Sequence, residues 1–389
     1  MPVSLLRRAL QGPLFFHTRL PAVLLLGILL SSGQPAHADC SEGDTCSNAS
    51  ADSGDTLNGI PLELTGEPED LGDDNTDVDD SDTDNTVDDT AIITPVGTYL
   101  PPQKMKSGTY RVACVGIKWL NYDRPAASAQ QCRSLVSALN RYYSKNSRGK
   151  VTLLSAGGFT HEAGLNANGK NLRKVEAEIR QLYRADLHVI PSIITYPHAN
   201  NRIAHVKSAS FMTAAHEMGH LLGQAHSGAY LYNRDGTPQR NKDGRYVFLS
   251  YGDDSSIMGR VLSGYLTPPQ YWRVGWLPKD EYAIYNPATP TYELKRLNEV
   301  DRKGVSTVII PSVEKGGHSI FVSVSRRRGH DLVSVHLSRG TDSRRVIRFG
   351  GDAYDDVYFT GLKLRVLERT PQSVRITIEQ GPVLPGYGI

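Results

Sequence analysis

Three histidines and a glutamate lie within the segment 216–226, which reads His-Glu-Met-Gly-His-Leu-Leu-Gly-Gln-Ala-His. On a helix, His216 and His220 are one turn apart and share one face, so both imidazoles can bind one metal ion. Gly223 can adopt the positive φ that ends a helix and reverses the chain, which allows His226 to return as a third nitrogen ligand. Three protein ligands leave one zinc position open for water, which is the arrangement of a catalytic zinc site.

Glu217 is the candidate general base of this site. The helical period turns it about 100° from His216, which places its carboxylate beside the metal but outside the ligand set. A zinc ion lowers the pKa of the water at its open position to about 7 and polarises a carbonyl, and Glu217 would take a proton from that water. The expected chemistry is hydrolysis of an amide bond without a covalent enzyme intermediate.

The helix that must position these residues is also visible in the sequence. Its apolar stripe lies opposite the histidine face and consists of Phe211, Ala215, Met218 and Leu222. Ser208 and Ser210 are both candidate N-caps, and Gly223 is the expected stop. A His-Glu-x-x-His match alone is weak, because a helix can carry such histidines by chance. The added glycine and third histidine favour a zinc site over that alternative.

The full motif resembles that of the metzincin metallopeptidases, which also carry a methionine-containing turn beneath the zinc. Met258 is the one methionine between the motif and the C-terminus and is therefore the candidate for that turn. Within the metzincins, the segments 226–227, 251–258 and 266–276 are similar to the gametolysin (algal autolysin) family, and the resemblance covers roughly residues 110–380. It implies a zinc endopeptidase with His216, His220 and His226 as zinc ligands, Glu217 as general base and Met258 as support.

The surroundings of this turn depart from the wider metzincin pattern. Arg260 stands two residues after Met258, where astacin-like and serralysin-like metzincins have a zinc-proximal tyrosine, so no tyrosine ligand is implied. The stretch between the strand near residue 190 and the zinc helix is also short. Asp253 and Asp254 are expected to accept hydrogen bonds and not to bind the metal, because three histidines already fill the protein's share of the zinc shell.

The first 38 residues are predicted to be a signal peptide. Three arginines precede the apolar run 20–30, and small residues follow up to Ala36-His-Ala38. A membrane span needs about 18 or more apolar residues, so a cleaved signal is favoured over an uncleaved anchor. We expect cleavage after Ala38 and a secreted or extracytoplasmic protein without a stable membrane anchor.

Residues 39–103 form an acidic segment with 18 Asp and Glu and no Lys or Arg. Such a segment cannot bury enough apolar surface to offset its ordering entropy, and we expect a disordered linker or pro-segment. Residues 104–389 carry 40 Lys and Arg against 23 Asp and Glu, a net charge of +17. The opposite charges suggest that the acidic segment covers the basic catalytic domain until it is removed, with a solvated linker as the commoner alternative.

Two places have some features of a structural calcium site. The segment 80–84 reads Asp-Ser-Asp-Thr-Asp, as at the start of a calcium loop, but the glycine and the distal glutamate of such a loop are missing. Asp235 and Asp243 belong to Asn-x-Asp-Gly turn signals, which fit a β-hairpin or irregular insertion over 230–249 better than a metal site. Calcium is therefore the weaker expectation.

The four cysteines of an exported chain favour two disulfides. The expected pairs are Cys40–Cys46 and Cys114–Cys132. The alternative is that Cys40 or Cys46 binds the zinc as a latency thiolate, but neither lies in a known switch segment.

Residues 104–280 are predicted to form a metzincin-like catalytic domain of the α+β class, with a mixed sheet and an active-site helix. Strands are expected at 110–119, 150–155 and 187–196, the last broken by Pro191, and helices at 126–143 and 171–183. The first helix has its apolar residues at helical spacing, namely Cys132, Leu135, Val136 and Leu139. The second helix should bury Leu172, Val175, Ile179 and Leu182. An edge strand above the cleft would let a substrate peptide add as a further strand. The isolated histidines of this half are predicted to be surface or polar-core residues, namely His161, His188, His198 and His205.

Residues 281–389 are predicted to form an all-β, antiparallel sandwich-like domain. Alternating strands are expected at 305–313, 319–325, 332–338, 345–349, 362–367 and 374–379. Basic loops at 326–328 and 344–345 could attach to an anionic cell-surface polymer, although a solvated basic surface is the commoner explanation. Aromatic residues do not alternate with these cations, which makes nucleic acid a poor candidate partner.

Together these features predict a secreted zinc-dependent endopeptidase that hydrolyses extracellular or cell-wall proteins through a zinc-bound water activated by Glu217. The expected partner is a protein or peptide substrate, such as a glycoprotein of the cell wall or extracellular matrix, and the expected oligomeric state is a monomer. Two alternatives remain. One is a zinc amidase acting on peptidoglycan cross-links, and the other is a non-catalytic surface-binding protein.

Overall fold

The computed structural model describes residues 99–260, 265–299, 303–340 and 342–380. All of these residues belong to one compact unit. The predicted signal peptide, the Cys40–Cys46 pair and the calcium-loop candidate at 80–84 lie outside the described residues. Among the helices that are described, none is long and apolar enough to cross a bilayer.

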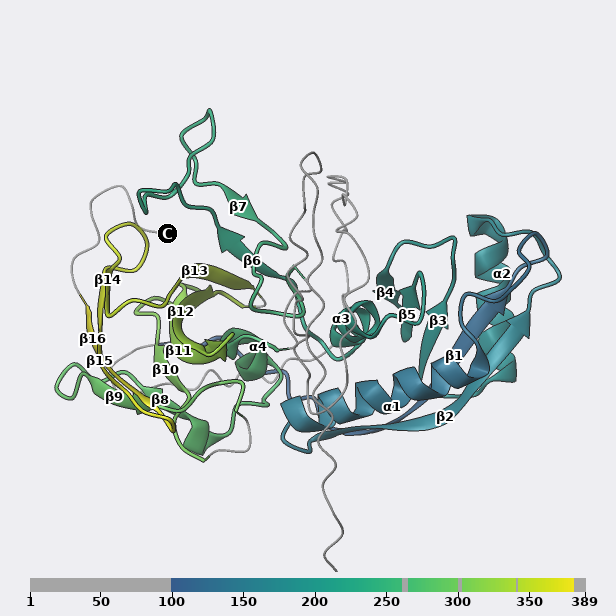
Figure 1. Cartoon of the computed structure of the whole chain (residues 1–389), viewed down its shortest axis with the longest axis horizontal. Coiled ribbons are helices and arrows are strands. Elements are labelled where there is room, and N and C mark those ends of the chain that lie inside the picture. The colour runs from purple at the N-terminus through teal and green to yellow at the C-terminus, as the bar shows by residue number, and fades with distance from the viewer. Residues whose placement is uncertain (1–98, 261–264, 300–302, 341, 381–389) are drawn as a thin grey trace, which may run out of the picture. The chain divides into compact units, whose positions relative to one another are not determined.

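A five-stranded mixed sheet forms the first half of the fold (Figure 1). Its strands are β1 (Gly108–Lys118), β2 (Val151–Glu162), β3 (Leu187–Pro191), β4 (His198–Asn200) and β5 (Ile203–Val206). The order is β2-β1-β3-β5-β4, with parallel pairs throughout except for β4, which is antiparallel to β5 and forms an edge. The mixed sheet was predicted, but β4 and β5 were not, because both are too short to show a clear alternation.

Helices cover both faces of this sheet. They are α1 (Ala129–Asn146), α2 (Gly169–Leu182) and α3 (Phe211–Leu221). Successive residues of β1 point to opposite faces. Val112 and Cys114 share a core with α1 and α3, whereas Ala113 and Val115 share a core with α2. A disulfide between Cys114 and Cys132 joins β1 to α1, which confirms that predicted pair.

The inward stripes of the first two helices are largely as predicted. The four apolar residues expected to face inward from α1 are buried, and so are Leu172, Val175 and Ile179 of α2. The prediction for Leu182 is wrong, since its exposed fraction is 63%. Leu182 is the last residue of the helix, and the ring of Tyr183 packs against the core in its place, 4.5 Å from the ring of Phe159.

Two largely antiparallel sheets form the second half. The seven-stranded sheet has the order β7-β6-β13-β12-β11-β10-β8, and the four-stranded sheet has the order β14-β15-β16-β9. The strands are β6 (Ser227–Tyr230), β7 (Phe248–Leu249), β8 (Tyr282–Ile284), β9 (Thr291–Leu294), β10 (Thr307–Ile310), β11 (Ser319–Arg327), β12 (His330–Ser338), β13 (Ser343–Phe349), β14 (Ala353–Asp355), β15 (Leu362–Arg369) and β16 (Val374–Gln380). Residues from both sheets form one apolar core.

The second half differs in two ways from the expected antiparallel arrangement. The pairs β10–β8 and β13–β6 are parallel. In addition, β6 and β7 precede residue 280, so the seven-stranded sheet takes strands from both sides of that position. The strand β6 follows directly after His226, so this sheet reaches the candidate metal site.

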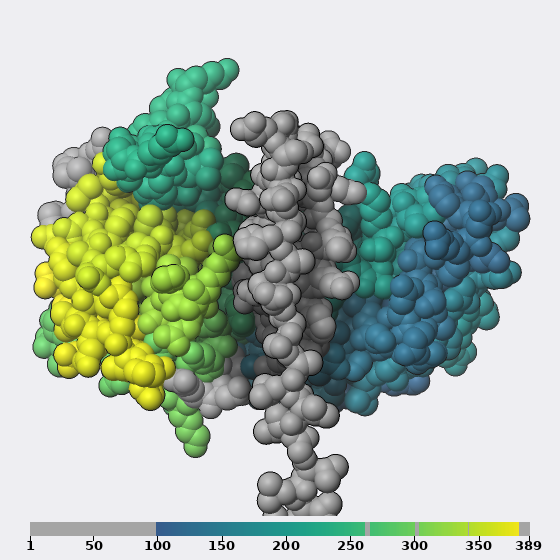
Figure 2. All heavy atoms as spheres, in the orientation of Figure 1, coloured from purple at the N-terminus to yellow at the C-terminus, as the bar shows by residue number. Residues whose placement is uncertain are grey.

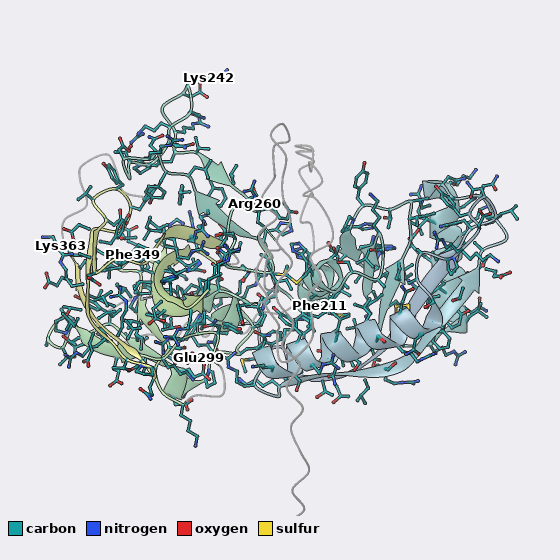
Figure 3. All side chains as sticks on the ribbon, in the orientation of Figure 1. Phe211, Lys242, Arg260, Glu299, Phe349 and Lys363 are labelled. Atoms are coloured by element: carbon teal, nitrogen blue, oxygen red, sulfur yellow. A yellow bond between two sulfur atoms is a disulfide. The ribbon has the colours of Figure 1, made fainter. Side chains whose placement is uncertain are left out.

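The segment 231–247 projects from the surface between β6 and β7 (Figure 2). Hydrogen bonds from Gly236 N to Asn233 O and from Gly244 N to Asn241 O close the two turns that the sequence predicted. Figure 3 places Lys242 at the tip of this projection. The predicted irregular insertion is therefore confirmed.

A short N-terminal segment and a fourth helix connect the two halves. The helix α4 (Pro268–Arg273) is followed by a 3₁₀ turn at Lys279–Glu281. Tyr99 pairs with Ser312 next to β10, and Leu100 is buried. The indole of Trp272 donates a hydrogen bond to Pro101 O at 2.8 Å. Structural contacts thus begin upstream of residue 104, the predicted start of the catalytic domain.

Candidate metal centre

The helix α3 carries the first two histidines of the site. Ser210 is its N-cap, although its side chain makes no capping hydrogen bond. The predicted apolar face of the helix lies against the first core, with Ala215 and Met218 fully buried. The helix ends at Leu221, and Gly223 has φ +86°, which reverses the chain as predicted.

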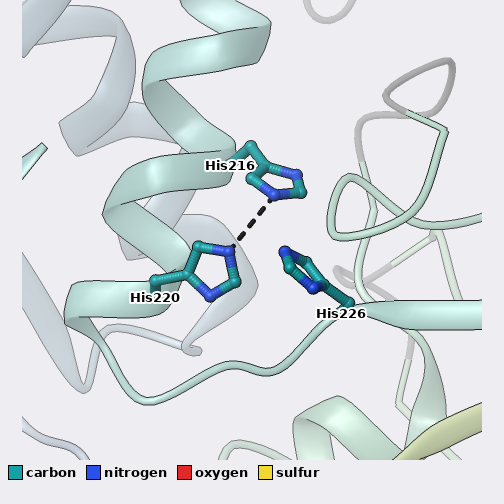
Figure 4. Close-up of side chains that lie close together, drawn as sticks. All are labelled: His216, His220 and His226. Carbon is teal, nitrogen blue, oxygen red and sulfur yellow. Dashed lines mark hydrogen bonds between the residues drawn. The ribbon is translucent and has the colours of Figure 1, made fainter. Parts of the chain in front are cut away.

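His216, His220 and His226 come together at one point (Figure 4). One ring nitrogen from each lies within 4.8 Å of the others. His216 is buried, and the other two are partly buried. In the described part of the chain, no other group of three histidines, cysteines or acidic residues lies this close together. Asp235 instead accepts hydrogen bonds from Thr237 in its turn, which leaves the calcium prediction there without support.

Backbone carbonyls fix the tautomers of the two helical histidines. Nδ1 of His216 lies 2.7 Å from Ile257 O, and Nδ1 of His220 lies 2.9 Å from Gln224 O. A carbonyl accepts only, so each Nδ1 carries the proton and each Nε2 keeps a lone pair in the neutral ring. This is the arrangement that orients histidine ligands in metal sites.

The two Nε2 atoms face each other at 3.2 Å (Figure 4). With both protons on Nδ1, neither Nε2 can donate, so two lone pairs are held close together without a hydrogen bond between them. A cation that both atoms bind would remove this repulsion. The donor set therefore fits a metal ion, and three imidazoles suit zinc or a similar transition metal and not calcium or magnesium.

The surroundings keep these imidazoles neutral, as metal ligands must be. Burial, with a smaller effect of neighbouring His220, lowers the pKa of His216 to about 4. Burial and the two other rings lower the pKa of His226 to about 3. The pKa of His220 is also lowered, mainly by burial.

Glu217 is buried beside this group. Its exposed fraction is 4%, and its Oε2 has no hydrogen-bond partner within the described structure. Burial raises the pKa of this carboxyl to about 8. A buried carboxyl oxygen without a partner costs stability, which favours a role in chemistry over a role in structure.

Met258 packs against the helix α3 at Gly219. It is fully buried in the first core. A Cβ added at Gly219 would lie only 2.4 Å from Met258 Sδ and 3.3 Å from the hydroxyl oxygen of Tyr143. Glycine at position 219, between the two helical ligands, is therefore what allows the sulfur to approach the helix backbone.

Tyr251 is a residue of the site that the sequence did not reveal. Its ring centroid lies 4.0 Å from that of His226 and 6.0 Å from that of His216. Burial and the charge of Glu217 raise the pKa of its phenol. Tyr251 precedes Met258, whereas the metzincin pattern has its tyrosine two residues after the methionine, at position 260 of this chain. No local signal distinguishes Tyr251 from the other tyrosines of the chain.

The other histidines of the first half are polar-core or surface residues, as predicted, since His161, His188 and His205 are buried and His198 is exposed. The rings of His198 and His205 stack with centroids 4.2 Å apart, and His205 Nε2 lies 3.6 Å from Glu176. His161 Nε2 lies 3.3 Å from Glu178. These partners lie apart along the sequence, so their proximity depends on sheet pairing and on the position of α2.

Asp253 and Asp254 are hydrogen-bond acceptors, as predicted, and their main partners come from the basic part of the chain. Arg345 binds both carboxylates, and Arg327 and Arg348 bind Asp254 at 2.9 and 2.7 Å. Arg326 and Arg344 likewise pair with Asp331 and Asp342. Much of the basic character of these loops is thus neutralised within the protein, which weakens the case for a polymer-binding patch.

Neither a scan against models of protein families nor a search of curated proteins finds a match for this chain. What the chain does must therefore be argued from the three histidines and the residues that surround them.

Proposed function

We propose that this protein is a secreted zinc-dependent endopeptidase that hydrolyses peptide bonds of extracellular or cell-wall proteins. The observation that carries the proposal is the pair of Nε2 lone pairs on His216 and His220, fixed 3.2 Å apart with His226 beside them. A catalytic zinc site has three such protein ligands.

When bound by these histidines, zinc supplies an open coordination position that activates a water and polarises a carbonyl. Glu217 follows His216 in the helix and has a carboxylate oxygen without a partner. Beside the positive charge of a bound zinc, Glu217 would be ionised despite its burial. It would then accept a proton from the attacking water and pass it to the leaving nitrogen. Burial keeps bulk water from this carboxyl, which strengthens its hydrogen bond to a reacting group.

An edge strand next to the site supports a peptide substrate. The helix α3 packs against both β4 and β5, and β4 is the edge strand of the five-stranded sheet within the described part of the chain. His198 and Asn200 on β4 are exposed. An extended peptide that adds to this edge would be held through its backbone, which suits a protease of broad sequence preference.

We also propose that the chain is a metzincin close to the gametolysin family. The position of Met258 beneath the zinc helix supports this, as does the reversal at Gly223 before the third histidine. The disulfide between Cys114 and Cys132 supports an extracytoplasmic location, because such bonds persist in oxidising compartments.

The test compares two substrates under one set of conditions. Purified protein is incubated with a casein gel and with purified peptidoglycan, each with and without a chelator. Cleavage of casein that the chelator abolishes and zinc restores supports the proposal. Release of peptidoglycan fragments without casein cleavage would point to the zinc amidase instead.

A further inference from the structure

The third histidine is held from the C-terminal half of the protein. Ser227 follows His226 and begins β6, which pairs in parallel with β13 in the register Ser227 to Ser343. The Ser227 hydroxyl lies 3.0 Å from the Ser343 hydroxyl. Ser227 N donates to Met258 O at 2.8 Å, which links this strand to the turn around Met258 (residues 253–260), called the methionine turn below. His226 is therefore positioned by a sheet whose other strands lie mostly beyond residue 280.

The methionine turn also orients the first histidine. Ile257 O receives the Nδ1 proton of His216 at 2.7 Å. The same turn closes on itself through Arg260 N to Asp253 O at 3.2 Å. Any shift of this turn moves the carbonyl that fixes the His216 tautomer and the carbonyl that holds Ser227, so it would disturb two ligands together.

Asp253 attaches the methionine turn to the seven-stranded sheet. Its carboxylate is fully buried and accepts hydrogen bonds from Ser227 Oγ at 2.8 Å, His336 Nε2 at 3.1 Å and Arg345 Nη1 at 3.0 Å. Burial alone would raise the pKa of this carboxyl, but the hydrogen bond and charge of His336, with Arg345, hold it well below its usual range. His336 is itself buried and lies on β12, at the centre of the seven-stranded sheet.

We infer that Asp253, His336 and Arg345 form a carboxylate anchor that positions His216 and His226 for the metal. The inference rests on the metal site proposed above and extends it, because the C-terminal sheet becomes a necessary part of the metal centre and not an attached binding module. The anchor residues are positioning residues that act on the histidines through the methionine turn. Removal of a partner would leave the buried charge of Asp253 with fewer donors, and the turn would shift to find others.

The test measures metal affinity and ligand geometry in variants of the full protein. His336→Leu removes the donor, His336→Gln keeps an N–H at a similar position, and Arg345→Met removes the partly exposed cation. Arg375→Ala is the control, since it breaks only the exposed pair between Arg375 and Glu368. Zinc affinity is measured by competition with a chelator, ligand geometry by the visible absorption of the cobalt-substituted protein, and folding by circular dichroism of the metal-free variants.

We expect His336→Leu to weaken zinc binding by about 10- to 100-fold and to change the cobalt absorption, as is typical when a residue behind a metal ligand is lost. His336→Gln should restore most of the affinity, and Arg375→Ala should match the wild type. If His336→Leu does not fold, the zinc affinity and the cobalt absorption of Arg345→Met test the anchor instead. Unchanged affinity and absorption in folded variants would overturn the anchor alone. A wild-type protein that binds no zinc would instead overturn the metal site, and the anchor with it.

Discussion

The Nε2 atoms of His216 and His220 lie 3.2 Å apart, and the other nitrogen of each ring faces a backbone carbonyl. Because each carbonyl accepts the single ring proton of its neutral histidine, neither Nε2 carries a proton. The protein therefore holds two lone pairs in contact at a place where His226 adds a third nitrogen. In the metal-free state this repulsion destabilises the folded protein. A cation bound between the rings would instead be attracted to both lone pairs.

Zinc should therefore stabilise the folded chain. The metal-free protein is expected to melt at a lower temperature, and zinc at about 1,000 times its dissociation constant should add about 4 kcal/mol to the free energy of unfolding. Thermal unfolding with and without zinc measures this difference. His226→Ala should respond much less, because it lacks one ligand. An equal zinc response in this variant would show that the ion binds elsewhere.

Gly219→Ala should destabilise the protein although alanine favours helices. Alanine gains about 1 kcal/mol over glycine in a helix, but its Cβ would meet Met258 Sδ at 2.4 Å. Such overpacking costs about 1–3 kcal/mol, so we expect a lower unfolding temperature and weaker zinc binding. The control is Gly169→Ala, at the first position of α2, where a Cβ would meet nothing within 4 Å. If Gly219→Ala is as stable as Gly169→Ala, the methionine does not support the helix as described.

The segment before residue 104 should contribute to stability. A chain that begins at Lys104 loses buried Leu100, the pairing of Tyr99 with Ser312 and the acceptor of the Trp272 indole. An unsatisfied buried donor alone costs about 1–3 kcal/mol. We therefore expect this chain to unfold at lower urea concentration than a chain that begins at residue 95. Equal midpoints would show that these contacts add nothing.

Acid should weaken the contact between Asp254 and its arginines. Burial would raise the pKa of Asp254, but Arg348 and Arg345 lower it to about 2 from an ordinary value of 3.8. Because the folded-state pKa is the lower one, the carboxylate stabilises the fold at pH values above its unfolded pKa. That contribution is lost as the pH falls from about 4 towards 2.

Urea unfolding of the wild type and of Asp254→Asn at several pH values isolates this effect. Titration of the histidines contributes to both proteins and cancels in the difference. The stability difference between the two should be constant above about pH 4 and should shrink below it. A difference that does not change between pH 4 and pH 2 would contradict the ion-pair description of Asp254.

Local patterns were sufficient to predict the helix that carries His216 and six strands of the C-terminal half, namely β10, β11, β12, β13, β15 and β16. Helical periodicity, strand alternation and turn residues are properties of neighbouring positions, so a sequence displays them. The pair Cys114–Cys132 could be predicted because few pairings are available to four cysteines. The grouping of His216, His220 and His226, which could hold a metal ion, was predicted from their spacing.

Other parts depend on contacts between distant positions. The packing of Tyr251 on His226 and the bond between Asp253 and His336 follow from how the methionine turn meets the sheets, and neither pair shares a local pattern. Leu182 fits the inward stripe of its helix, but only the tertiary packing shows that Tyr183 fills that place. The short strand β4 is held by pairing with β5 and has little strand signal of its own.

In the proposed site, three histidines bind a zinc ion at which Glu217 acts as the base. The most direct test measures zinc content and peptide-library cleavage for the wild type and for Glu217→Gln, with Glu314→Gln as the control at an exposed glutamate. We expect one zinc per chain in all three proteins, with cleavage in Glu217→Gln reduced about 10²- to 10⁴-fold or more, because the amide cannot accept the proton. Glu314→Gln should cleave as the wild type does. Zinc-loaded Glu217→Gln that cleaves peptides at the wild-type rate would contradict the role of Glu217, and a wild type without zinc would contradict the site itself.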